Sequence, residues 1–315
     1  MTVAAGISRV GICGVGQMGA AAAVAFKRGG YEVLAWDQDP ERLAGVEETA
    51  ASLEDWMDRH VGSALRAGGA ITPAGDPAEL DRGADLVMDA IVEDLDRKGE
   101  LLRGFAVARE RGAIFISTTS GLPITELGRR GACAGLLAGT HFWNPPHLMP
   151  LVEVVRGEGT PDSVMDRVCE VMTSIGKIPV RVNRDVPGFI GNRMLHALWR
   201  EAIYLVQEGV ATAEEIDTVA RLTFALRMPA LGPLENMDLV GLDLIGAIHD
   251  YLMESLSNEG EPLPALRDRI GRGELGAKSG MGFHDWSGRD AADVADRRDR
   301  QIVRQLAYLR ETGGL

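Results

Sequence analysis

Apolar and polar residues alternate along the first part of the chain in a way that predicts strands separated by helices. Short apolar runs of strand length stand near residues 9–13, 31–37, 84–94, 113–117, 135–141 and 151–155. Segments rich in alanine or with apolar residues at helical spacing lie between most of these runs. Strands that alternate with helices form a sheet covered on both faces. The pattern therefore predicts an α/β domain with a doubly wound, mostly parallel sheet.

The pattern changes near residue 185, after which only helical spacing continues to the end of the chain. The triplet Asp185-Val186-Pro187 has the composition of a helix start. We therefore expect an α/β domain over 1–184 and an all-helical domain over 185–315. The apolar faces of these helices exceed what one small bundle can cover, which favours a homodimer interface in the second domain.

Composition narrows the possible partners and compartments. A chain of 315 residues favours two domains, and a net charge of −13 argues against nucleic acid or an anionic membrane surface as a partner. Apolar runs stay shorter than about 18 residues and the N-terminus lacks a charged leader pattern, so neither a membrane span nor a signal peptide is expected. The three cysteines (Cys13, Cys133 and Cys169) are widely spaced, which favours reduced thiols in a cytoplasmic protein.

A glycine motif follows the first strand. Gly14, Gly16 and Gly19 have the spacing GxGxxG, which permits a tight turn, close approach of a pyrophosphate and close packing of the next helix. The second strand ends at Asp37, where a carboxylate can bind the adenine ribose hydroxyls. Gln38 follows without an adjacent arginine, so a 2′-phosphate would be repelled and the cofactor is expected to be NAD. The expected cofactor residues of this Rossmann-type unit are Gly14, Gly16, Gln17, Met18, Gly19 and Asp37.

A histidine and a carboxylate stand in two consecutive apolar runs. His141 ends the run "GLLAGTH", and Glu153 interrupts "LVEVV" twelve residues later. A carboxylate inside a buried strand is costly unless it is paired. An imidazole can accept a hydroxyl proton near neutral pH, and a carboxylate on its other nitrogen would orient it. We therefore interpret the two residues as a base and its partner, rather than as two separately satisfied core residues.

Other polar residues stand at expected strand ends. Glu93, Ser120 and His141 all occupy such positions, where open α/β sheets bind their ligands. His147, in "NPPHL", fits either a substrate pocket or polar surface. The remaining histidines lack metal-ligand spacing, and no metal site is expected.

The chain resembles the 3-hydroxyacyl-CoA dehydrogenase family, of the short single-unit bacterial type. The resemblance rests on the glycine motif and on six further motifs: "AIVEDLDRK", "STTSGL", "HFWNP" with Glu153, "DVPGFIGNR", "GPLENMDLVGLD" and "GAKSGMGF". It implies NAD, a helical dimerisation domain and a His–Glu dyad that oxidises a secondary alcohol. By position it implies His141 as the base and Glu153 as its partner. It also implies Ser120 and Asn192 around the substrate, and Glu93 and Lys98 on the cofactor side.

Two departures from the family keep the substrate open between a 3-hydroxyacyl thioester, or a related 3-hydroxy acid, and a smaller compound without CoA. Thr118 stands where many acyl-CoA enzymes have Asn, and residues 41–66 contain six acids against three arginines instead of a lysine-rich helix. In these features the chain is similar to pyridine-carboxylate, L-gulonate and carnitine dehydrogenases. A non-catalytic NAD-binding or structural protein is a third alternative, against which His141, Glu153 and Asn192 argue.

Overall fold

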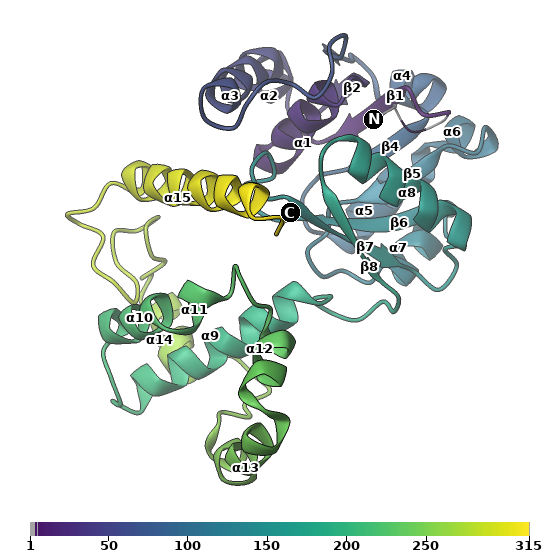
Figure 1. Cartoon of the computed structure of the whole chain (residues 1–315). Coiled ribbons are helices and arrows are strands. Elements are labelled where there is room, and N and C mark those ends of the chain that lie inside the picture. The colour runs from purple at the N-terminus through teal and green to yellow at the C-terminus, as the bar shows by residue number, and fades with distance from the viewer. Residues whose placement is uncertain (1–3, 5, 315) are drawn as a thin grey trace. The chain divides into compact units, whose positions relative to one another are not determined.

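The computed structural model of the chain describes residue 4 and residues 6–314, and it divides into two compact units (Figure 1). The first unit ends at Arg193, and the second begins at Met194. The split falls within the first turn of a helix, α9 (Gly191–Gln207). In the described part of the chain, we find no helix with the length and apolar character needed to cross a membrane.

The first unit is built on one eight-stranded sheet with the order β3-β2-β1-β4-β5-β6-β7-β8. Neighbouring strands are parallel except for β6 and β7, which are antiparallel. The carboxyl ends of β1, β4, β5 and β6 therefore share one edge of the sheet. The strands are β1 (Arg9–Cys13), β2 (Glu32–Trp36), β3 (Ala70–Pro73), β4 (Leu86–Asp89), β5 (Ile114–Ser117), β6 (Leu137–Phe142), β7 (Leu151–Arg156) and β8 (Ile178–Val182).

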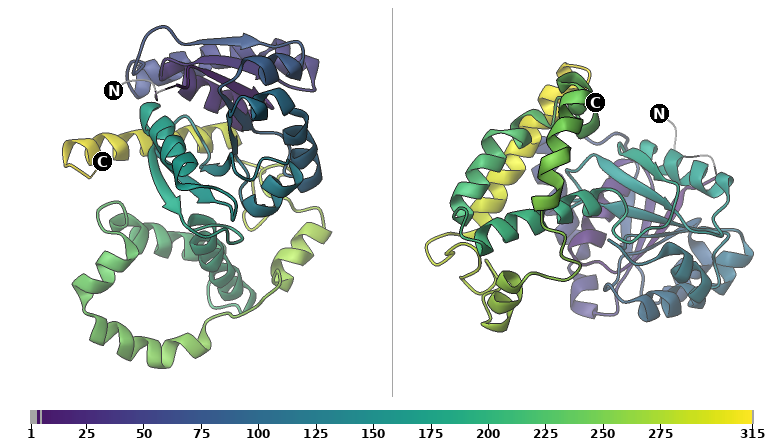
Figure 2. Two further views of the ribbon diagram at one scale, coloured as in Figure 1. Left: turned by 90° about the vertical axis from the view of Figure 1, so that its right-hand side faces the viewer. Right: turned by 90° about the horizontal axis from the view of Figure 1, so that it is seen from below.

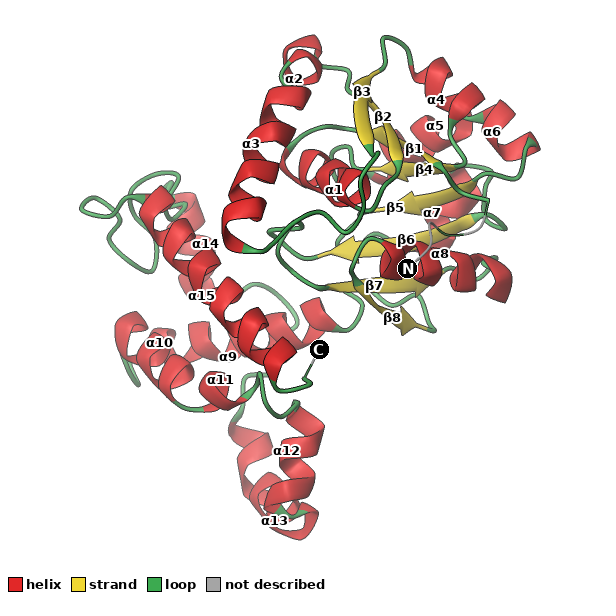
Figure 3. Cartoon of the chain, turned by 45° about the horizontal axis from the view of Figure 1, so that its top comes forward, coloured by secondary structure: helices red, strands yellow, loops and turns green. Residues whose placement is uncertain are grey.

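Helices cover both faces of this sheet (Figure 3). Buried residues of α1, α3 and α8 form one apolar core with the sheet, and residues of α4, α5, α6 and α7 form a second. This confirms the predicted doubly wound architecture, in which the central strands β4, β5 and β6 are buried on both faces. The helices of the unit are α1 (Gln17–Arg28), α2 (Pro40–Ala44), α3 (Val46–His60), α4 (Pro77–Gly83), α5 (Leu95–Gly104), α6 (Ala106–Glu110), α7 (Ile124–Arg130) and α8 (Asp162–Ser174).

The second unit, drawn from green to yellow in Figure 2, consists of helices joined by loops, as its sequence predicts. Within the described residues of this unit, isolated β-bridges join Gly276 to Met281 and Met281 to Asp285. Its helices after α9 are α10 (Ala213–Leu222), α11 (Phe224–Arg227), α12 (Pro233–Val240), α13 (Leu242–Leu252), the 3-10 turn Met253–Ser255, α14 (Pro264–Gly271) and α15 (Ala291–Glu311).

Three sequence-based boundaries were wrong. The strand expected over 84–94 ends at Asp89, so Glu93 lies in the following loop. The largely helical stretch expected over 40–72 contains β3 after α3 ends at His60. The helix expected from Asp185 begins at Gly191. Gly188 and Phe189 have φ values of 76° and 51°, whereas residues of a right-handed α-helix have negative φ values, so the helix cannot begin before them.

Candidate active site

The antiparallel pairing of β6 with β7 brings His141 and Glu153 together. The two residues are directly opposite each other in the ladder, so their side chains leave the same face of the sheet. His141 Nδ1 lies 2.7 Å from Glu153 Oε2, and the two residues are 4% and 2% exposed. The contact expected from the sequence is therefore present, and it is fixed by backbone register.

The second carboxylate oxygen of Glu153 is bound by the backbone. Oε1 accepts hydrogen bonds from the N–H groups of Ile190 and Gly191, at 2.8 and 3.0 Å. Burial raises the pKa of Glu153, but the hydrogen bonds from His141, Gly191 and Ile190 outweigh it and hold the pKa below the usual value. An ionised Glu153 can only accept, so Nδ1 of His141 carries the hydrogen and Nε2 keeps its lone pair.

Aromatic rings enclose the imidazole. The ring centroids of Trp143 and Phe189 lie 5.0 and 5.7 Å from that of His141. Phe189 is buried in a left-handed conformation (φ 51°), which costs a bulky residue on the order of 1–3 kcal/mol. Gly191 is needed next to this turn, since a Cβ there would lie 2.2 Å from Trp143 Cζ2. The strained turn thus presents a ring to His141 and two N–H groups to Glu153.

A chain of hydrogen bonds joins the dyad to the other residues expected in the site. Asn192 follows Gly191, and its Nδ2 donates to the carbonyl oxygen of Ser120 at 2.9 Å. Ser120 N donates to Glu93 Oε1 at 2.9 Å, and the same oxygen accepts from Thr119 Oγ1 at 2.6 Å. Three separate motifs of the sequence therefore meet at the carboxyl ends of β4, β5 and β6.

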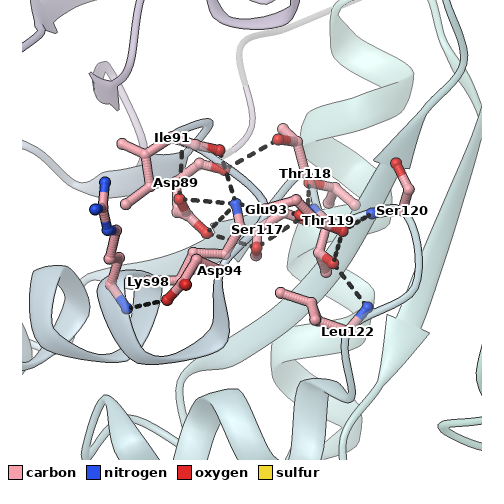
Figure 4. A network of polar contacts seen from close by, with 12 residues as sticks. Asp89, Ile91, Glu93, Asp94, Lys98, Ser117, Thr118, Thr119, Ser120 and Leu122 are labelled. Carbon is pink, nitrogen blue, oxygen red and sulfur yellow. Dashed lines mark hydrogen bonds and ion pairs between the residues drawn. The ribbon is translucent and has the colours of Figure 1, made fainter. Parts of the chain in front are cut away.

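Lys98 anchors the far end of this network (Figure 4). Its Nζ lies 3.0 Å from Asp89 Oδ2, 3.2 Å from the carbonyl oxygen of Ile91 and 3.7 Å from Glu93 Oε2. Asp89 Oδ2 also accepts from Ser117 Oγ at 2.7 Å. Burial raises the pKa of Asp89, against the lowering effects of Lys98 and Ser117. Lys98 is 1% exposed, and its ammonium binds the end of β4 and the loop that follows it. A direct contact of Lys98 with the cofactor stays a prediction.

Asp89 and Ser117 were missed by sequence reasoning. Both end short apolar runs that form β4 and β5. The criterion that singled out Glu153, a carboxylate in a buried strand, applies equally to Asp89 in "LVMD". Its partner Lys98 stands 9 residues later, in the first turn of α5.

The glycine loop has the geometry that a dinucleotide pyrophosphate requires. A Cβ on Gly14 would lie 2.6 Å from the carbonyl oxygen of Ala90, and one on Gly19 would lie 1.8 Å from that of Gly14. Gly16, in contrast, faces open space and begins α1 without a side-chain cap. The backbone N–H groups of this helix start are thus open to an anionic group, so the loop fits NAD.

A cavity of about 620 Å³ lies beside this loop, and five of the six residues expected there from the glycine motif and the second strand line it. Gly14, Gly16, Gln17, Met18 and Asp37 line it. Asp37 accepts hydrogen bonds from Val15 N at 2.8 Å and Asp39 N at 2.9 Å, and each carboxylate oxygen keeps a further lone pair for a ribose hydroxyl. Arg42 and Arg97 also line the cavity, although sequence reasoning considered only the residue next to Asp37.

A second cavity, of about 930 Å³, lies between the glycine loop, the α2–α3 region and the loop after β6. Pro145, Pro146 and His147 form its β6 side, and Gln17 joins the two loops through a 3.3 Å hydrogen bond to Asn144 Oδ1. His147 thus lines a cavity, and its contact with substrate stays a prediction. Its ring meets the edge of Trp56 at a centroid distance of 5.8 Å.

The charged residues that line this second cavity are mainly acidic. Asp39, Glu41 and Glu48 line it together with Arg42. Of the other two arginines in 41–66, Arg59 pairs with Asp55, and Arg66 donates to the carbonyl oxygen of Gly29.

Family models match nearly the whole chain. The model described as 3-hydroxyacyl-CoA dehydrogenase, NAD binding domain, matches residues 9–186. The model for the C-terminal domain of 3-hydroxyacyl-CoA dehydrogenase matches residues 188–286.

Curated relatives carry three different names. A 5-formyl-3-hydroxy-2-methylpyridine 4-carboxylate 5-dehydrogenase of Mesorhizobium japonicum is 32% identical over 94% of this chain and 96% of its own. A crystal structure described as that dehydrogenase, an NAD⁺-dependent dismutase, has a TM-score of 0.91 and 31% identity over 96% of this chain and 99% of its own. A probable 3-hydroxybutyryl-CoA dehydrogenase of Deinococcus radiodurans is 36% identical over 88% and 100% of the two chains. An L-carnitine dehydrogenase of Streptomyces griseus is 33% identical over 98% and 91%.

Proposed function

Because the chain belongs to the 3-hydroxyacyl-CoA dehydrogenase family, we propose that it oxidises the secondary hydroxyl of a 3-hydroxyacyl thioester or a related 3-hydroxy acid. It is an NAD-dependent oxidoreductase acting on CH–OH groups. The observation that carries the reaction type is the buried contact of 2.7 Å between His141 Nδ1 and Glu153 Oε2.

The dyad supplies the proton acceptor. When bound, NAD supplies the acceptor for the hydride that leaves the carbon. His141 Nε2 takes the hydroxyl proton as the C–H bond breaks, and general-base help of this kind contributes roughly 10²–10⁴-fold. Glu153 stays ionised, fixes the tautomer and stabilises the imidazolium that forms.

Two further groups orient the substrate. Ser120 and Asn192 are bound to each other through the Ser120 carbonyl, and we assign them to the polar groups of the substrate near its hydroxyl. Residues 1–184 then form the NAD-binding domain, and residues 185–315 the substrate and dimerisation domain. The 930 Å³ cavity lined by His147 takes the part of the substrate remote from the hydroxyl.

Steady-state NAD reduction at 340 nm tests the proposal. The panel contains 3-hydroxybutyryl-CoA, free 3-hydroxy acids, carnitine and pyridine carboxylates, with His141→Ala as the inactive control. We expect turnover of at least one 3-hydroxy compound by the wild type alone. NAD binding without turnover on the whole panel would leave the non-catalytic alternative.

The mainly acidic lining of the 930 Å³ cavity favours a second candidate function, in which the substrate is a small carboxylated alcohol or aldehyde without CoA. Asp39, Glu41 and Glu48 line the cavity together with Arg42, whose Nε lies 3.3 Å from Asp39 Oδ2. Phosphate groups of CoA would therefore meet net negative charge. The TM-score of 0.91 to the pyridine-carboxylate enzyme supports the same candidate. On the panel, it predicts that a free carboxylate has the highest kcat/KM.

We also propose a cytoplasmic homodimer. Cys13, Cys133 and Cys169 are free thiols, as expected in a reducing compartment. Large apolar side chains of the second unit are strongly exposed, among them Leu226, Leu234, Leu239 and Tyr251. Light scattering at micromolar concentration tests the assembly, and a monomeric mass would contradict it.

A further inference from the structure

Lys177 is a buried charge that the reaction does not use. It is one of four lysines in the chain, and it lies between α8 and β8 with 7% of its surface exposed. Lys98, the other buried lysine among the described residues, is paired with the carboxylate of Asp89. The Nζ of Lys177 instead donates to two backbone carbonyls, those of Pro146 at 2.6 Å and Met149 at 2.9 Å.

Both acceptors belong to the loop between β6 and β7, residues 143–150. Prolines at 145, 146 and 150 lack an N–H, so the loop cannot pair as a strand. Its internal contacts are a turn in which Leu148 N and Met149 N donate to the Pro145 carbonyl, each at 3.0 Å. The ammonium of Lys177 therefore binds two carbonyls of this turn and connects the turn to the residue that follows α8.

The backbone next to Lys177 continues this attachment. Lys177 N donates to the Met172 carbonyl at the end of α8, and Ile178 N donates to the Pro150 carbonyl at 2.8 Å. The lysine stem is thus fixed at its base while its tip reaches the loop. The loop begins directly after His141 and Phe142, and its Pro145–His147 segment forms one side of the 930 Å³ cavity.

We propose that Lys177 is a positioning residue that sets the shape of the 143–150 loop and thereby the affinity for the part of the substrate in this cavity. The proposal rests on the proposed function, because it takes the cavity as the substrate site. The geometry of the dyad does not depend on Lys177, since His141 and Glu153 are held opposite each other by the β6–β7 ladder.

The protonation of Lys177 supplies a readout specific to this role. Burial lowers the pKa of Lys177 to about 8. The ammonium is therefore lost in the folded state as pH rises through about 8, whereas the unfolded chain keeps it up to about 10.4. The titration of Lys177 therefore makes the free energy of unfolding increase with pH over this interval. A neutral amine binds carbonyls less strongly than an ammonium, so the substrate KM should increase over the same interval. A lysine with only a structural role would change stability alone.

The kinetic experiment compares wild type, Lys177→Met and Lys177→Arg between pH 7.5 and 9.5, using the panel compound with the highest kcat/KM. Lys27→Met, which removes a lysine paired with Glu54 on the protein surface, is the matched control. Loss of charged hydrogen bonds should raise the substrate KM of Lys177→Met about tenfold at pH 7.5, with kcat changed less than about threefold. The pH-dependent increase in KM should be confined to wild type and Lys27→Met, since arginine keeps its charge and methionine has none.

Hydrogen exchange measured by mass spectrometry tests the loop without turnover. Peptides covering 143–150 should exchange faster in Lys177→Met than in Lys27→Met, with β6 unchanged. Wild-type exchange and wild-type KM in Lys177→Met would overturn the proposal, and so would a loss confined to kcat. If Lys177→Met does not fold, the KM profiles of wild type and Lys177→Arg decide. Faster loop exchange with no substrate turned over by the wild type would instead reject the proposed function alone.

Discussion

Replacing Glu153 by glutamine tests how the dyad works, because the amide can satisfy the same neighbours only if His141 changes its tautomer. One carboxylate oxygen accepts from Ile190 N and Gly191 N, and the other accepts from His141 Nδ1. Glutamine has one oxygen and one NH₂ group. Placing the oxygen toward the two backbone donors satisfies more hydrogen bonds, so the NH₂ group then faces His141.

That orientation reverses the tautomer of the imidazole. Nδ1 must accept from the amide, so Nε2 carries the hydrogen and cannot take a proton from the substrate. We therefore expect kcat/KM to fall roughly 10²–10⁴-fold, the usual worth of a general base. This corresponds to about 3–5 kcal/mol of transition-state stabilisation. Folding should be retained, because the amide keeps both backbone hydrogen bonds and still bonds to the imidazole in its reversed tautomer.

The assay is NAD reduction at 340 nm, with the affinity for NAD measured separately by calorimetry. Glu110→Gln, which changes an exposed carboxylate on α6, is the matched control and should behave as wild type. NAD affinity should stay within about threefold of wild type, since Gly16 and Asp37 do not contact the dyad. A folded Glu153→Gln enzyme with more than about a tenth of wild-type kcat/KM would refute the tautomer reasoning.

The remaining predictions concern the base, the cofactor, the substrate and acid stability. His141→Ala should lower kcat at least about a hundredfold with little change in NAD affinity; substantial residual turnover would mean that another base acts. Asp37→Ala should weaken NAD binding roughly tenfold to a hundredfold and narrow the preference over NADP, measured as the ratio of kcat/KM; equal use of both cofactors by the wild type would reject the role of Asp37. Free hydroxy carboxylates should rival 3-hydroxybutyryl-CoA in kcat/KM; efficient thioester turnover that weakens with added salt would show that Arg42 binds phosphate. The stabilising effect of Glu153 over its glutamine variant should be present above pH of about 4.3 and disappear as pH falls through its lowered pKa, which acid unfolding followed by circular dichroism can test.

The sequence was sufficient for features that depend on local pattern. The GxGxxG spacing placed the first turn, and the single carboxylate in "LVEVV" identified Glu153 as a partner for His141. Both inferences use rules that need no knowledge of distant contacts: glycine where backbones approach, and pairing of a buried charge.

The rest depends on contacts between distant segments. Lys177 follows α8 in an ordinary polar turn, and only the fold brings it to Pro146 and Met149. Phe189 adopts a left-handed conformation that its residue type disfavours, so local preference pointed to a helix start at Asp185 instead. The hydrogen bond from Asn192 to the Ser120 carbonyl likewise joins residues that are 72 positions apart, so the local sequence could not predict it.

The pairing of β6 with β7 places the dyad and part of the cavity lining on different parts of the chain: the dyad on the strands, and cavity residues on the loop between them. The dyad is set by the ladder itself, whereas the intervening loop carries cavity residues such as His147. Insertions or substitutions within that loop leave His141 opposite Glu153 as long as the strand register holds. If the cavity is the substrate site, as proposed above, evolution can change this loop and the substrate while the base is kept. Such changes would give rise to relatives with different substrates, and the relatives of this chain are named for a thioester, for carnitine and for a pyridine carboxylate.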